Sequence, residues 1–250
     1  MNDKRAYYYP VLAYVLLFFA MWVLSWLIGV LELLATAEWG LNPLVSAEGV
    51  RWAIRNSLQA LNDVPWGTVV IVIAVVGFLR GSGLKKAIYR LFGPERMTEN
   101  QKRASMYALF ALLCSILIIS MTIVSPWNLL LGVSGGLTAS PLLQGWLILL
   151  FFCVAFISMT YGFIYGNYRS AMDVVCSLGD TFVLSVPALI AIVPAAGIIS
   201  GLEYTGVFML FDMQSEDVAV FADVIFAIPF LYIILLRRME RNENIENSLF

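Results

Sequence analysis

The sequence contains no histidine. Mechanisms that need an imidazole as base, proton shuttle or metal ligand are therefore excluded within this chain, which removes most hydrolases and most zinc enzymes. Charge is also scarce, since 13% of the 250 residues are charged and 61% are hydrophobic. The mean hydropathy is +0.85. One soluble core could not enclose so much apolar side chain, which excludes a soluble globular protein.

Cysteine is rare as well. Cys114, Cys153 and Cys176 lie within or beside apolar segments, and their spacing fits neither a metal site nor a paired disulfide. We expect all three to be small buried residues.

Long uncharged runs are separated by short, densely charged segments, which is the layout of a polytopic membrane protein. A helix needs roughly 20 residues to cross the hydrocarbon layer. Read against this length, the uncharged runs give six spans, at about residues 8–31, 64–79, 104–124, 142–166, 181–200 and 218–236. The first run is too long for a signal peptide and is followed by large residues, so we expect it to remain as a helix. The predicted fold is an all-α membrane protein with about six transmembrane helices.

Lys and Arg are distributed unevenly among the connections. If the N-terminus is cytoplasmic, 13 of the 15 Lys and Arg residues lie on the cytoplasmic side, and only Arg51 and Arg55 lie outside. Because cytoplasmic connections carry such an excess, we expect both termini in the cytoplasm.

The two halves of the chain show a weak internal similarity, with Ala53, Asn62 and Gly77 aligning on Ala171, Asp180 and Gly197. Three spans per unit would place the second unit upside down, as in many secondary transporters. We therefore predict a 3+3 inverted repeat with interrupted or re-entrant segments. The first unit is residues 1–124, and the second is residues 125–250 with a cytoplasmic tail at 237–250.

Residues 46–62 form an amphipathic stretch within the first unit. Its apolar residues at helical spacing are Val50, Ile54, Leu58 and Leu61, and its polar face carries Glu48, Arg51, Arg55 and Gln59. We expect a helix that lies along the outer membrane interface, where the neighbouring tryptophans would also sit.

Short or interrupted spans are the best sequence indication of a transport site, because broken helices expose backbone groups to a cavity. The span 64–79 is short and is followed by Gly81, Ser82 and Gly83, and the span 181–200 contains Pro187 and Pro194. We predict that these five residues frame the substrate site. The alternative is that they are kinks that help helices to pack.

The connection 125–141 is polar but uncharged. It could form a re-entrant element in which Asn128 and Ser134 bind the substrate, or it could be an ordinary outer loop. Its Gly-x-Ser-x-Gly letters resemble a serine hydrolase elbow, but that mechanism lacks its histidine here.

Asp223 is the acidic residue that lies well inside a predicted span, which makes it a candidate proton or Na⁺ ligand. The alternative is a water-exposed helix end. Asp63 and Asp180 each precede a span, where we expect them to cap helix N-termini. A weaker alternative is that Asp173 and Asp180 bind a cation together.

Two short motifs resemble a known family. Residues 44–52 read LVSAEGVRW, and after an apolar span residues 81–84 read GSGL. This is similar to the N-terminal part of the p-aminobenzoyl-glutamate transporter (AbgT) family, where an LLS-x-EG-[IV]-R element precedes an apolar hairpin ending in Ser-Gly-Leu. The resemblance covers residues 11–110 and, more loosely, 163–208. Family members are longer, and they carry an acidic residue where this chain has Arg80.

The resemblance implies a bacterial inner-membrane protein with re-entrant hairpins and a homodimeric assembly. It also implies cation-driven transport of small, often carboxylated molecules.

Our leading hypothesis is a secondary transporter of a small organic anion, coupled to Na⁺ or H⁺, acting as a homodimer or larger oligomer in the lipid bilayer. We expect no cofactor, no bound metal, no nucleic-acid partner and no enzymatic activity. The alternative is a non-transporting membrane scaffold that acts through the basic segment from Arg80 to Arg103.

Overall fold

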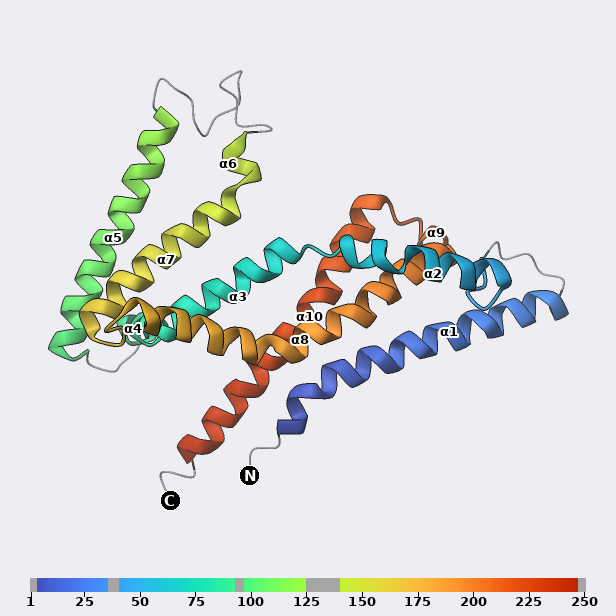
Figure 1. Cartoon of the computed structure of the whole chain (residues 1–250), viewed down its shortest axis with the longest axis horizontal. Helices are drawn as coiled ribbons and strands as arrows, with labels where there is room; N and C mark the ends of the chain where they lie inside the picture. Colours follow the sequence, from blue (N-terminus) through green and yellow to red (C-terminus); the bar gives the residue numbers. More distant parts are fainter. Residues whose placement is uncertain (1–3, 36–40, 93–96, 125–139, 247–250) are drawn as a thin grey trace. The chain divides into compact units, whose positions relative to one another are not determined.

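The computed structural model describes residues 4–35, 41–92, 97–124 and 140–246 (Figure 1). The described residues are 88% helix and include no strand. The elements are η1 (Lys4–Tyr8), α1 (Tyr9–Ala35), α2 (Ala47–Asn62), α3 (Trp66–Gly81), α4 (Leu84–Phe92), α5 (Glu99–Val124), α6 (Pro141–Gln144), α7 (Trp146–Tyr165), α8 (Ala171–Thr205), α9 (Val207–Leu210) and α10 (Ser215–Glu246).

Six helical segments are long and apolar enough to cross a membrane, as the sequence predicts. They are Ala6–Leu31, Leu58–Gly81, Glu99–Ile123, Trp146–Tyr165, Ala171–Thr205 and Ser215–Glu240. The all-α fold with six candidate membrane spans is therefore confirmed.

The chain divides into two compact units, one made of Met1–Pro65 with Ser185–Phe250 and the other of Trp66–Leu184. These boundaries differ from the predicted repeat boundary between residues 124 and 125. The inverted repeat stays a prediction.

In the first unit, α1 packs against the second half of α8 at two glycines spaced four residues apart. Phe18 lies against Gly197, and Met21 lies against Gly201. Such small-residue spacing lets membrane helices approach closely. Four alanines of α8 are also buried, and they are Ala188, Ala191, Ala195 and Ala196.

Helix α10 contacts α1 at a backbone carbonyl that a proline leaves unpaired. Pro229 has no N–H, so the carbonyl of Ile225, four residues earlier, loses its partner within the helix. The Tyr14 hydroxyl donates to that carbonyl oxygen at 2.7 Å. Tyr7 also donates to the Glu240 carboxylate. These bonds join η1 and the first half of α1 to two separate places along α10.

The motif at residues 44–52 starts α2. The Ser46 hydroxyl accepts a hydrogen bond from the Gly49 N–H at 2.9 Å and caps the helix. A Cβ on Gly49 would lie 2.4 Å from the Leu44 carbonyl oxygen, so the chain folds back too closely for a side chain there. Trp52 stacks on Tyr204 with ring centroids 4.4 Å apart. The predicted helix 46–62 is confirmed as a helix; its place at a membrane interface stays a prediction.

In the second unit, α5 and α7 run antiparallel and pack along their length, and α3 packs on α7 (Figure 1). Small residues of α5 make this close packing possible, and the buried ones are Ala104, Ala108 and Ala111. Phe78 of α3 meets Phe151 of α7 edge-on, with ring centroids 5.9 Å apart.

Helix α8 is longer than predicted and is not broken. The predicted span 181–200 is only part of it, because Ala171–Thr205 is one helix of 35 residues that contains Pro187 and Pro194. A proline removes only its own N–H and frees one carbonyl, and membrane helices tolerate this where neighbours satisfy the backbone. The expected interruption at the two prolines is therefore wrong.

The predicted N-caps are also wrong. Asp63 follows the end of α2, where its N–H donates to the Gln59 carbonyl, and Asp180 lies inside α8. Ser170 precedes α8 as its N-cap, and the Asp173 carboxylate in the first turn accepts from the N–H of Ser170 at 2.9 Å and of Arg169 at 2.7 Å. The Ser170 hydroxyl accepts in return from the Asp173 N–H at 3.3 Å, which completes a capping box.

The cysteines are less buried than expected. Cys114 and Cys153 are half-buried, Cys176 is exposed, and all three are free thiols. The expectation of three core residues fails because each lies on a helix face that is only partly covered.

Candidate functional site

The turn between α3 and α4 is the strongest candidate site in the second unit. Gly83 has φ +79°, a left-handed backbone that glycine adopts without strain. The Ser82 side chain is fully buried, and its hydroxyl accepts from the Leu84 N–H at 3.2 Å. The turn therefore closes α3 and starts α4 within three residues.

The turn is held against the connection between α7 and α8. The Asn167 side-chain amide donates to the Ser82 carbonyl oxygen at 2.7 Å. A Cβ on Gly81 would lie 2.4 Å from the Ser177 Cβ and 2.5 Å from the Tyr168 hydroxyl. Only glycine fits this position with the observed spacing.

Tyr168 is buried at the centre of this contact. Its hydroxyl and the Ser177 hydroxyl are 3.1 Å apart, and Ser177 also donates to the Val174 carbonyl at 2.9 Å. Burial raises the pKa of the Tyr168 phenol above its usual value, and the hydrogen bond with Ser177 lowers it in part. The phenol stays protonated at neutral pH, so the contact is polar and uncharged.

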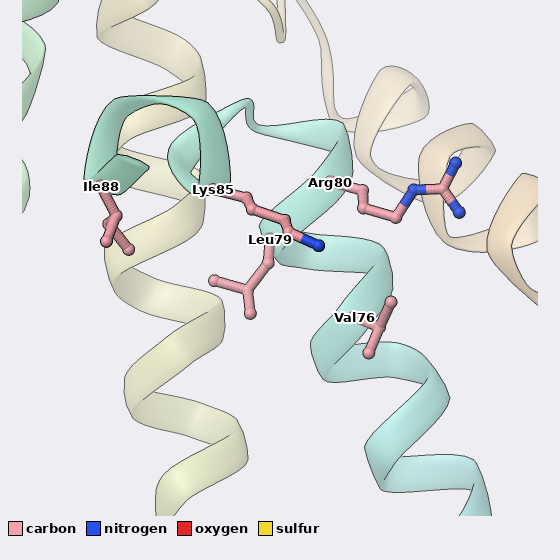
Figure 2. A pocket seen from close by; sticks show the side chains of 5 residues that line it. All are labelled: Val76, Leu79, Arg80, Lys85 and Ile88. Carbon is pink, nitrogen blue, oxygen red and sulfur yellow. The ribbon is translucent and has the colours of Figure 1, made fainter. Parts of the chain in front are cut away.

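A cavity of about 220 Å³ lies beside the turn, lined by Val76, Leu79 and Arg80 of α3 and by Lys85 and Ile88 of α4. Figure 2 shows the Lys85 side chain extending from α4 toward α3, while the Arg80 guanidinium points away from Ile88. The turn thus places two basic residues around an otherwise apolar cavity.

A second polar group lies between α5 and α7. Gln101 is 3% exposed and donates to the Tyr165 hydroxyl at 3.3 Å, and Tyr161 stacks on Tyr165. Among the side chains that the structure describes, the buried hydroxyls of Ser105 and Ser158 have no hydrogen-bond partner. Sequence reasoning missed these residues, although Ser105 and Ser158 lie within predicted spans where a hydroxyl needs a partner.

The predicted site residues are distributed over both units. Gly81, Ser82 and Gly83 form the turn, whereas Pro187 and Pro194 belong to the first unit. Pro187 is buried and Pro194 half-buried. Asn128 and Ser134 lie outside the described residues. Because Ser82 is buried and hydrogen-bonded, the turn forms a packing contact between α3 and the α7–α8 connection. Its role in substrate binding stays a prediction.

Asp223 lies on α10, and its side chain is exposed. The buried side of the same helix carries Phe226, Pro229 and Ile233. Asp223 therefore does not face the interior of its own unit. Within the described ranges, no three His, Cys, Asp or Glu side chains are grouped so that they could hold a metal ion.

Sequence reasoning missed the partners of the turn, namely Asn167, Tyr168 and Ser177. The signal was weak: a polar Gly-Asn-Tyr sequence after an apolar run is typical of any helix end. Gly166 at φ +92° and the bond from the Tyr168 N–H to the Gly162 carbonyl confirm a glycine-terminated helix.

The comparisons with known proteins decide the family. The AbgT putative transporter family matches residues 90–236, which is more than half of the chain. The chain belongs to this family. The match includes α5, α7, α8 and most of α10, but it leaves out the motifs at 44–52 and 81–84 that carry the resemblance seen in the sequence. Searches of curated proteins and of solved structures found no match. The AbgT family assignment and the six apolar helices make this an integral membrane protein of transporter type.

Proposed function

We propose that this AbgT family protein is a secondary active transporter of a small organic anion, such as an aminobenzoyl-glutamate-like or other carboxylate. Transport would be coupled to Na⁺ or H⁺. The observation that carries this proposal is the family match over residues 90–236, together with six helices able to cross a membrane. It makes transport, rather than catalysis, the expected activity.

The orientation proposed for the chain follows from its charges. With both termini in the cytoplasm of a bacterial inner membrane, 13 of 15 Lys and Arg residues lie inside. Lys85 and Lys86 of α4 and Lys102 of α5 would then lie at the cytoplasmic ends of their helices, and α2 would lie outside.

Asp223 is the proposed coupling residue. A carboxylate in the membrane is costly unless water, a cation or a partner meets it, and this side chain is exposed on α10. A second copy of the chain in a homodimer is one way to cover it. Gly81, Ser82, Gly83, Asn128, Ser134, Pro187 and Pro194 remain the proposed substrate-site residues.

The test is transport by the purified protein in proteoliposomes, with a panel of small carboxylates that includes aminobenzoyl-glutamate. We expect substrate-dependent charge displacement that requires a Na⁺ gradient or a pH step, and a radiolabelled uptake control covers electroneutral exchange. Asp223→Asn should abolish the cation dependence. Glu216→Gln, in the exposed first turn of the same helix, is the matched control and should transport normally.

A non-transporting scaffold is the second candidate. The observation that favours it is the basic helix α4, which holds Lys85, Lys86 and Arg90 without an acidic residue. Folded protein that transports nothing, and that always purifies with one larger partner, would support the scaffold and contradict the transporter.

A further inference from the structure

The cavity beside the α3–α4 turn is amphiphilic. Val76, Leu79 and Ile88 supply apolar walls, and Lys85 and Arg80 supply positive charge. It offers no acidic side chain to a metal ion. Its volume of about 220 Å³ is also small for a typical small-molecule site, which encloses roughly 300–1,000 Å³. The lining fits the charged end of a larger amphiphile whose remainder lies outside the cavity.

An apolar strip leads along α3 away from the turn. The side of α3 that is buried holds Val69, Ile73, Gly77 and Phe78. Val72, at 45% exposure, lies one turn before the half-buried Val76, and Leu79 follows about one turn later. Because α3 belongs to a segment, Leu58–Gly81, that is long and apolar enough to cross a membrane, this strip offers a surface for a hydrocarbon chain.

Helix α4 has the residue pattern of a helix at a membrane–water interface. Leu84 and Ala87 are buried in the core of the unit. On its open side, Ile88 is 45% and Tyr89 77% exposed beside exposed Lys85. Apolar and aromatic side chains interleaved with lysines are typical of helices that rest in the headgroup region.

Both charged residues that line the cavity, Arg80 and Lys85, are basic. Between Asp63 and Glu95 the sequence carries four charged residues, and all of them are basic: Arg80, Lys85, Lys86 and Arg90. Helix α7, which packs on both α3 and α4, has no charged residue. On α5, Glu99 is paired with Lys102 at 3.1 Å. An anionic group in the cavity would therefore meet the positive charge of Lys85 directly.

We propose that this cavity binds an anionic phospholipid, with its phosphate on the Lys85 ammonium and Arg80 at the rim. The acyl chains would lie along Ile88 and the α3 strip of Val76 and Leu79. The proposal does not depend on transport, because it rests only on the lining, the strip and the charge of one unit.

The test is lipid binding by purified, delipidated protein in a non-ionic detergent, followed by native mass spectrometry. Dioleoyl phosphatidylglycerol is titrated against dioleoyl phosphatidylcholine. We expect retention of phosphatidylglycerol over phosphatidylcholine. Lys85→Gln should weaken phosphatidylglycerol binding about fivefold, the effect of one basic residue near an anionic lipid surface. Lys86→Gln, at the adjacent exposed position outside the cavity, is the matched control and should stay within about twofold of wild type.

Two further binding measurements distinguish a lipid from other ligands. Water-soluble glycerol phosphate should not displace bound phosphatidylglycerol, since it lacks the acyl chains. Ile88→Ser, at a half-exposed position that does not support the core, should weaken phosphatidylglycerol binding.

The lipid site is wrong if Lys85→Gln and Lys86→Gln weaken binding equally, or if phosphatidylcholine binds as well as phosphatidylglycerol. Displacement by glycerol phosphate would show a site for soluble anions instead. Because this assay measures no flux, its failure leaves the proposed transport untouched, and inactive proteoliposomes would leave the lipid site untouched.

Discussion

The two compact units use glycine in different ways. In the first unit, Gly201 lies against the flexible end of Met21, whose Cε would be 2.5 Å from an added Cβ. In the second unit, Gly81 lies against the Ser177 Cβ at 2.4 Å, an atom fixed to the backbone of α8. A methionine end can move aside, but a Cβ moves only with its helix. The first contact is therefore adjustable and the second is rigid.

The largest effect that this comparison predicts is that of Gly81→Ala. The added methyl must push α8 away from α3 or displace the Tyr168 hydroxyl, and we expect a loss of about 3 kcal/mol in the free energy of unfolding. Reversible unfolding in mixed detergent micelles, followed by circular dichroism, measures it.

Gly201→Ala is the matched control for that variant, and its cost should stay below about 1 kcal/mol because Met21 can change rotamer. Equal losses in the two variants would contradict the distinction between a rigid and an adjustable contact.

Sequence periodicity predicts the spans well, because a run of apolar residues has one stable conformation in a bilayer. It predicts interruptions poorly. Pro187 and Pro194 look like breaks in the sequence, yet α8 continues through them, since the outcome depends on which neighbour satisfies the freed carbonyl. Pro229 shows the same dependence. The Ile225 carbonyl that it leaves unpaired accepts a hydrogen bond from Tyr14, more than 200 residues away along the chain.

In the candidate site, too, local signals could be predicted and contacts between distant residues could not. Gly81 and Gly83 could be predicted, because a glycine-rich turn after an apolar span is a local signal. Asn167, Tyr168 and Ser177 could not, because their contacts with the turn depend on how α3, α7 and α8 pack. Lys85 was visible only as one member of a basic segment, and the cavity distinguishes it from Lys86.

Asn167→Ala should have the second largest effect. It leaves the buried Ser82 carbonyl without the donor that lies 2.7 Å away, which costs about 1–3 kcal/mol of unfolding free energy. Asn56→Ala is the control, since Asn56 only donates to the Trp52 carbonyl within the exposed helix α2 at 3.0 Å. We expect that control to change the same unfolding measurement by less than about 0.5 kcal/mol. A larger loss in the control would show that the turn is not the more sensitive region.

Tyr14→Phe tests the proline contact of the first unit. Removing the hydroxyl leaves the Ile225 carbonyl unpaired, and we expect a loss of about 1 kcal/mol. In a Pro229→Ala background the backbone N–H of residue 229 can bond that carbonyl, so the same tyrosine change should cost clearly less. A double-mutant cycle measures the difference, and strict additivity would contradict the assignment.

The smallest effect concerns pH and the rigid contact around Tyr168. Burial raises the folded-state pKa of this phenol above its value in the unfolded chain, so its stabilising contribution is complete below about pH 10 and is lost as the pH rises through the folded-state pKa. Tyr168→Phe removes both the hydrogen bond with Ser177 and the titration. The free-energy difference between wild type and Tyr168→Phe, about 1 kcal/mol, should therefore be constant from about pH 6 to 9 and shrink above about pH 10. A difference that already changes near neutral pH would mean that Tyr168 ionises there and that the contact is not the neutral, close-packed joint that holds Gly81 in place.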